Sequence, residues 1–159
     1  LYDGLDRLIV GEVHLDGITK MLETMITTDG SMSTYHAFST DQAGERMKLG
    51  LQIETPGASA ETAASFVRQA VELVVVSEKI GANRRVTQIT EIDWRASSGA
   101  DRLSGSDLFT YNREKGVHQG GGRSPDPQGR IIRKGEKYGV EFPHNWFVDS
   151  EELKNFRLS

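Results

Sequence analysis

The stretch Asp6–His14, DRLIVGEVH, joins a short apolar run to a polar end. The run Leu8–Val10 predicts a strand buried on both faces, which is typical of parallel sheets. Gly11 and the carboxylate of Glu12 follow it directly. In open α/β sheets, ligands bind beyond the carboxyl ends of the parallel strands. The glutamate at this end is therefore a candidate for chemistry.

The composition limits the classes of protein that need to be considered. A chain of 159 residues favours one domain, or one domain with a small appendage. With a net charge of -4, the chain as a whole gives no argument for a nucleic-acid partner, and we expect none. The absence of cysteine excludes disulfides and thiolate metal sites. No apolar run approaches the roughly 18 residues that a membrane-spanning helix needs, so no span is expected.

The start of the chain also raises an expectation. The sequence opens LYDGL without a methionine, and its first strong strand begins a few residues later. A buried parallel strand needs neighbours on both sides. We therefore expect this chain to be the C-terminal part of a longer protein, with a processed mature chain as the alternative.

The first half of the chain has a regular pattern of helix and strand signals. One aspartate and two serines at capping positions, with apolar residues at helical spacing, predict three helices. Together with the strands, they predict the order β-α-β-α-α-β-β and an α/β layer with a parallel sheet. The expected elements are a strand at Leu8–Val13, a helix capped by Asp16, a strand at 31–38, a helix capped by Ser39 that runs to Glu54, a helix capped by Ser59, and two strands flanking a hairpin at Gly81–Asn83.

The second half has weaker signals. SDLFTYN at Ser106–Asn112 predicts a strand, and the glycine- and proline-rich segment Gly116–Gly129 is interpreted as a mobile loop. RIIRK, at 130–134, suggests one more strand. VDSEELKNF, at 148–156, has capping-box spacing and suggests a short terminal helix.

Two side chains are the candidates for catalysis. Glu12 follows the first strand, and His36 lies near the C-terminal end of the next predicted strand. If those strands are parallel neighbours, both side chains face the same crevice. The carboxylate could then orient or deprotonate a water or help to hold a hydrated Mg²⁺, and the histidine could bond a phosphate oxygen. The alternatives are an ordinary strand-end glutamate that faces solvent and a histidine with a structural role.

Other motifs give weaker signals. Gly120–Arg123 reads GGGR, but it has neither a preceding apolar strand nor a following Lys-[Ser/Thr], so a flexible loop is the interpretation. The whole chain contains no G-x-x-x-x-G-K-[ST] phosphate loop. Arg84–Arg85 is interpreted as a solvated hairpin end rather than an anion site. His14, His118 and His144 lack metal-ligand spacing with a carboxylate.

Several motifs in order resemble the C-terminal ATPase domain of the type II/IV secretion ATPases. DRLIVGEVH, LDGITKMLETM and DGSMSTYHAFSTDQAGERM are similar to the Walker B strand, the following helix and the histidine box of that family. VELVVVSEKIGANRRVTQITEI fits the strand and hairpin that come next. The closest likeness is to the CpaF/TadA-like branch, which drives assembly of Tad/Flp pili. The resemblance covers Leu5–Ile92.

This resemblance implies a fold and a site. It implies a partial RecA-like core with a mainly parallel sheet at 1–95, followed by a β-rich, loop-rich extension with a β-hairpin at 96–159. Glu12 would be the Walker B glutamate, which positions the attacking water and holds Mg²⁺ through water. His36 would be the histidine-box residue, and Gly11 and Arg46 would belong to the ATP site.

The resemblance also implies the setting in which the protein works. It implies a hexameric ring that uses ATP and Mg²⁺ and binds platform proteins of the inner membrane. The protein would be cytoplasmic and peripheral to that membrane.

The sequence departs from the family near the first strand, and this motivates a second hypothesis. Tyr2, Gly4 and Leu5 stand where the family has arginines and a proline, and His14 stands where it has an arginine. Lost positive charge near phosphates weakens nucleotide binding or transition-state stabilisation. The alternative is therefore a non-catalytic interaction module that keeps the same scaffold.

Overall fold

The structure is a computed structural model that describes residues 7–93, 103, 105–143 and 146–147. Contacts divide the chain into two compact units. The first unit comprises Leu1–Val71 with Asp93–Ser104, and the second comprises Glu72–Ile92 with Gly105–Ser159. The units group the residues differently from the expected division at 1–95 and 96–159, because strands before and after residue 95 share one sheet. That division remains a prediction.

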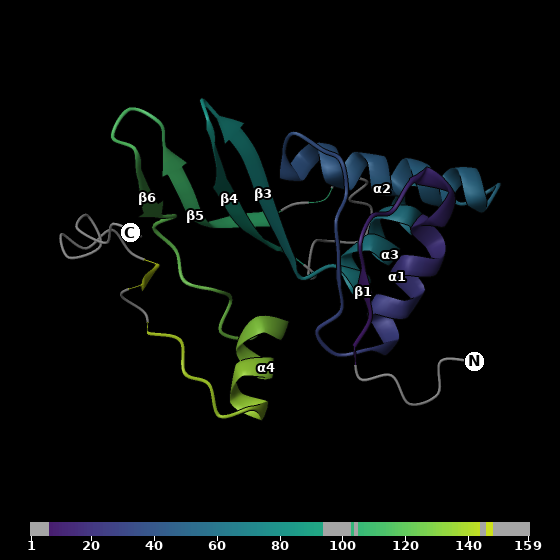
Figure 1. The fold of residues 1–159 in the computed structure, drawn as a ribbon. Coiled ribbons are helices and arrows are strands. Elements are labelled where there is room, and N and C mark those ends of the chain that lie inside the picture. The colour runs from purple at the N-terminus through teal and green to yellow at the C-terminus, as the bar shows by residue number, and fades with distance from the viewer. Residues whose placement is uncertain (1–6, 94–102, 104, 144–145, 148–159) are drawn as a thin grey trace. The chain divides into compact units, whose positions relative to one another are not determined.

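The first unit is a small α/β layer (Figure 1), and its element order matches the predicted one. No described helix is long and apolar enough to cross a membrane. The elements are β1 (Ile9–Val10), a 3-10 turn (Leu15–Gly17), α1 (Ile18–Thr27), β2 (Met32–Ser33), α2 (Thr40–Glu54) and α3 (Ala60–Ala70).

Two of the three predicted helix caps are confirmed. The Ser39 hydroxyl accepts a hydrogen bond from the Gln42 amide at 3.1 Å, and the Gln42 side chain accepts one from the Phe38 amide. Ser59 caps α3 in the same way. The prediction for Asp16 is wrong, because this residue lies inside the 3-10 turn and α1 begins only at Ile18.

The core of the first unit forms where α1 packs against α3 and α2. Ile18 and Leu22 on α1 and Val67 on α3 are fully buried. Gly50 on α2 permits the close approach, since a Cβ atom there would lie 2.8 Å from Ile18 Cγ1. Burying each large aliphatic side chain contributes about 1.5–3 kcal/mol, so this cluster anchors the helices.

The strands β1 and β2 pair in parallel, with Ile9 opposite Met32 and Val10 opposite Ser33. The predicted parallel neighbours are therefore confirmed. The predicted strands at Leu8–Val13 and 31–38 are wrong in extent, because β1 and β2 have two residues each. The expected burial of the first strand on both faces is also wrong, because Ile9 is 70% exposed. β1 is exposed because, among the described strands, it pairs with β2 alone.

The second unit is a four-stranded antiparallel sheet in the order β3-β4-β5-β6, followed by a helix (Figure 1). The expected mainly parallel sheet is wrong here, because tight turns join β3 to β4 and β5 to β6, and antiparallel strands need no crossover helix. The elements are β3 (Leu73–Ile80), β4 (Asn83–Ile92), β5 (Gly105–Asn112), β6 (Val117–Gly120) and α4 (Arg130–Lys137).

The predictions for the second unit have mixed outcomes. The hairpin at Gly81 is confirmed, and Gly81 adopts the positive φ of 61° that the tight turn requires. The strand at Ser106–Asn112 is confirmed within β5. The predicted loop Gly116–Gly129 is wrong over β6, where the His118 ring packs against Tyr111. The helix proposed at 148–156 lies outside the described residues.

The segment RIIRK forms the start of α4, and the strand predicted there is wrong. Arg130 and Lys134 lie one helical turn apart, and both reach Glu72. The Lys134 Nζ atom lies 2.8 Å from the carboxylate, and the Arg130 Nε atom lies 3.7 Å from it. Helical spacing places both cations on one face, so a single carboxylate holds this helix to the start of the sheet.

Glu78 connects the two turns of the sheet. Its carboxylate accepts hydrogen bonds from the Thr87 hydroxyl at 2.8 Å and from the Arg113 guanidinium at 2.7 Å. The Thr87 bond, followed by the bond and the charge of Arg113, holds the pKa of Glu78 below its ordinary value. A carboxylate with a lowered pKa stabilises the fold above its unfolded pKa and loses that contribution as the pH falls.

We therefore predict that Glu78→Gln destabilises the protein in a pH-dependent way. The gap in the free energy of unfolding between wild type and variant should be largest near neutral pH. It should shrink as the pH falls below roughly 4.3, the ordinary value for glutamate. Urea unfolding at several pH values measures the gap. Glu114→Gln, on the exposed turn nearby, is the control, and a gap that stays constant with pH would contradict the prediction.

Candidate functional site

The structure brings Glu12 and His36 together. Glu12 follows β1 and His36 follows β2, and parallel pairing places the ends of these strands side by side. The Glu12 Oε1 atom lies 2.8 Å from the His36 Nε2 atom. Since a carboxylate only accepts hydrogen bonds, Nε2 carries the proton and donates it. This contact leaves the second carboxylate oxygen of Glu12 available to a water molecule.

The pair is open to solvent. The His36 side chain is 85% exposed and the Glu12 side chain is 45% exposed. Water screens charges at such positions, so this contact adds little to the stability of the fold. Its value is geometric, because it orients a carboxylate that a ligand or a water can still reach.

The backbone around Glu12 is held by one residue of the neighbouring segment. The Thr34 hydroxyl donates a hydrogen bond to the Gly11 carbonyl, and the Val13 amide donates one to the Thr34 carbonyl at 3.1 Å. Gly11 has open space around its Cα, since a Cβ atom there would meet nothing within 4 Å. Gly11 therefore lies beside the pair, and its carbonyl is engaged by Thr34.

Arg46 lies on α2 and reaches the segment that carries the histidine. Its guanidinium carbon lies 5.4 Å from the centre of the Tyr35 ring, a cation–π distance. The structure records no hydrogen bond or ion pair from Arg46 to Glu12 or His36. The arginine thus contacts the residue next to His36 rather than the pair itself.

Sequence reasoning missed two residues at this site. Neither Thr34 nor Tyr35 belongs to a catalytic sequence motif. The Thr34 hydroxyl bonds the Gly11 backbone carbonyl, and the Tyr35 ring contacts the Arg46 guanidinium, so both residues act on other parts of the chain. The signal that could have found them is the alternation of side-chain direction along the predicted strand. This alternation places Thr34 on the same side as His36, and Tyr35 on the opposite side.

The described residues contain no group of three or more histidine, aspartate or glutamate side chains that could hold a metal ion by themselves. A single carboxylate still fits Mg²⁺, which keeps several waters and is commonly bound through one or two carboxylates and substrate phosphates. Glu12 is the residue here that could contribute, through its second oxygen or through water.

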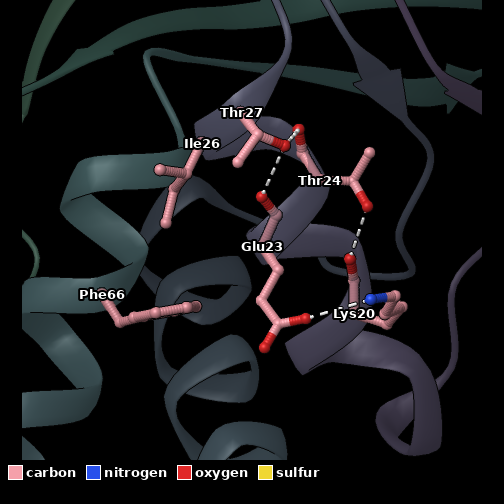
Figure 2. Close-up of a pocket in the computed structure, with 6 residues that line it drawn as sticks. All are labelled: Lys20, Glu23, Thr24, Ile26, Thr27 and Phe66. Atoms are coloured by element: carbon pink, nitrogen blue, oxygen red, sulfur yellow. Dashed lines mark hydrogen bonds and ion pairs between the residues drawn. The ribbon is translucent and has the colours of Figure 1, made fainter. Parts of the chain in front are cut away.

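A separate hollow of about 390 Å³ lies between α1 and α3. Figure 2 shows Phe66 facing Ile26 across it, with the Lys20–Glu23 ion pair on the α1 side. The Thr24 and Thr27 hydroxyls bond backbone carbonyls of their own helix. Neither Glu12 nor His36 lines this hollow, so the predicted site and the hollow are different features.

No protein-family model matches the sequence, and no curated protein matches it. The resemblance over Leu5–Ile92 therefore rests on the quoted motifs and their order.

Proposed function

We propose that this chain is part of an ATP-hydrolysing motor that powers pilus assembly or type II/IV secretion. The observation that supports the proposal most is the 2.8 Å contact between Glu12 and His36. The two residues are 24 positions apart in the sequence, and each follows a strand of the parallel pair β1–β2. An acid-base side chain at the end of such strands is where an α/β nucleotide enzyme needs it.

In the proposed reaction, Glu12 orients the water that attacks the γ-phosphate. His36 donates to one carboxylate oxygen and so directs the other oxygen toward that water. Phosphoryl transfer depends mostly on positioning and on stabilising charge, so a fixed carboxylate is useful without being a strong base. Bound Mg²⁺ would neutralise the developing charge on the phosphate oxygens. Arg46 and Gly11 would lie at the margin of the ATP site.

We further propose that the motor works as a ring of several subunits. The pair β1–β2 would belong to a RecA-like parallel core, and subunits would form a hexameric ring. The ring would be cytoplasmic, peripheral to the inner membrane, and would bind platform proteins there. The phosphates of ATP require a phosphate-binding loop, which the 159 residues do not contain, so the proposal requires that loop from another segment.

The first test of this function is Glu12→Gln in the full-length protein. The amide keeps the size of the side chain but cannot accept a proton, and losing a positioned acid-base group costs roughly 10²–10⁴-fold in rate. We expect ATP turnover to fall by that factor while the affinity for a fluorescent ATP analogue is retained. Glu23→Gln, on the solvent side of α1, is the control. Turnover like that of wild type in Glu12→Gln would refute the assignment.

The second test uses the 159-residue chain alone. We expect the purified chain to show no Mg²⁺-dependent ATP hydrolysis in a phosphate-release assay, because it has no loop to hold the phosphates. Denatured chain sets the background of the assay. Hydrolysis above that background, lost in Glu12→Gln, would show that the phosphates are held by residues within this chain.

A second candidate function is the non-catalytic interaction module, and one feature of the second unit favours it. Lys79 and Arg84 are direct cross-strand partners, although like charges in that position repel each other. Neither side chain bonds an acidic group among the described residues. Arg113 of the next turn binds Glu78, so both turns lie at this same end of the sheet. An acidic segment of another protein would relieve the repulsion.

This candidate predicts salt-sensitive binding to acidic protein segments. Poly-glutamate is a suitable probe, and we expect Lys79→Ser/Arg84→Ser to weaken its binding at low salt by about tenfold or more, since charge pairs at an interface steer and retain a partner. Lys20→Ser, on the first unit, is the control. Equal binding by wild type and the double variant would remove this candidate.

A further inference from the structure

The chain changes its pairing register at Gly11–Glu12. The partners Ile9–Met32 and Val10–Ser33 form a regular parallel ladder, and the Met32 amide donates to the Leu8 carbonyl at 2.9 Å. If this ladder continued, the amide of residue 12 would bond the Thr34 carbonyl. The Val13 amide makes that bond instead, at 3.1 Å. One extra residue is therefore accommodated between Val10 and Val13.

The Thr34 side chain also binds this irregular segment, through its hydroxyl group. It donates to the Gly11 carbonyl, while the Thr34 carbonyl accepts from the Val13 amide. Thr34 thus binds the peptide group before Glu12 and the peptide group after it. These two bonds leave the intervening residue little freedom to rotate, although its side chain is half exposed.

The same face of the chain holds the partner of the glutamate. Exposure alternates along Met32–Phe38, with Thr34 and His36 on the exposed side and Tyr35 half-buried between them. Residues two apart in an extended chain point the same way. Thr34 therefore holds the backbone of Glu12 while His36, on the same side, binds its carboxylate.

We infer that Thr34 is a positioning residue that sets the Glu12 carboxylate against His36. The geometric part of this inference stands on the described contacts, and its consequence for catalysis rests on the proposed ATPase function. The backbone bond from Val13 does not depend on the Thr34 side chain, so replacing the hydroxyl removes one bond and leaves the other in place. Valine has nearly the same shape as threonine and lacks only that donor.

The geometric test uses the 159-residue chain and the nuclear magnetic resonance signals of the His36 imidazole. In wild type, Glu12→Gln should shift the His36 ring nitrogen signals, because the substitution changes the group that accepts the Nε2 proton. In a Thr34→Val background the same substitution should shift them by less than half as much. In Thr34→Ser, which keeps the hydroxyl, the full shift should return. Equal shifts in all three backgrounds would overturn the inference.

One further readout and a second pair of variants distinguish a general loss of structure from a loss of the position of the Glu12 carboxylate. The core methyl signals of Leu22 and Val67 should remain in place in Thr34→Val, since Thr34 is exposed. If they move, Thr34→Ala and Thr34→Ser are compared instead, and the inference then requires that only the serine variant retain the His36 response. A loss of that response in both variants would contradict a role for the hydroxyl.

The catalytic test uses the full-length protein. Misplacing a reacting group by about an ångström costs up to roughly 10²-fold, so Thr34→Val should lower kcat by about 10–100-fold with KM for ATP unchanged. Thr34→Ser should recover most of the rate. If the wild-type full-length protein has no ATPase activity, the proposed function is refuted. The role of Thr34 is then tested by the His36 nuclear magnetic resonance experiment alone. A changed KM with unchanged kcat in Thr34→Val would overturn its positioning role.

Discussion

The burial of one face of α1 is the constraint on which the first unit depends. Ile18 and Leu22 are fully buried where α1 packs against α2 and α3, as is Val67 of α3, and this packing fixes the helix that joins β1 to β2. A helix that crosses between two strands returns the chain in the same direction, so the strands pair in parallel. Their ends then lie at one edge, and Glu12 meets His36 there. The proposed site is a consequence of apolar packing several residues away.

The second unit is organised by polar contacts that tie distant segments to the sheet. Glu72 holds α4 through Lys134 and Arg130, and the buried Glu91 carboxylate accepts a hydrogen bond from the Asp126 amide at 2.9 Å. Asp107 accepts bonds from two side chains of β4. Glu91 is buried, so removing its carboxylate would leave the Asp126 amide without this acceptor, which costs more than the net value of one bond. The segment between β6 and α4 is therefore held by the Glu91 carboxylate at Asp126 and by backbone hydrogen bonds from the Gly121 and Gly122 amides.

Local signals were sufficient for a large part of the fold. Helical apolar spacing and the serine caps at Ser39 and Ser59 are encoded within a few residues, and α2 and α3 follow them. The hairpin at Gly81 is equally local. RIIRK was mispredicted because its apolar pair resembles a short strand, whereas Glu72, far away in the sequence, favours a helix by binding two cations one turn apart. A contact between residues 62 positions apart in the sequence cannot be predicted from a pattern of a few neighbouring residues.

The sequence by itself determined the order of the elements from β1 to β5 and the two candidate side chains, Glu12 and His36, because capping, periodicity and residue chemistry are local properties. Only the tertiary structure decided three further matters. The larger sheet is antiparallel, and β1 is short and exposed. Thr34 forms hydrogen bonds to the peptide groups before and after Glu12. Each of these depends on which segments meet across the chain. Pairing and register are set by the packing of whole elements, which no short stretch of sequence specifies.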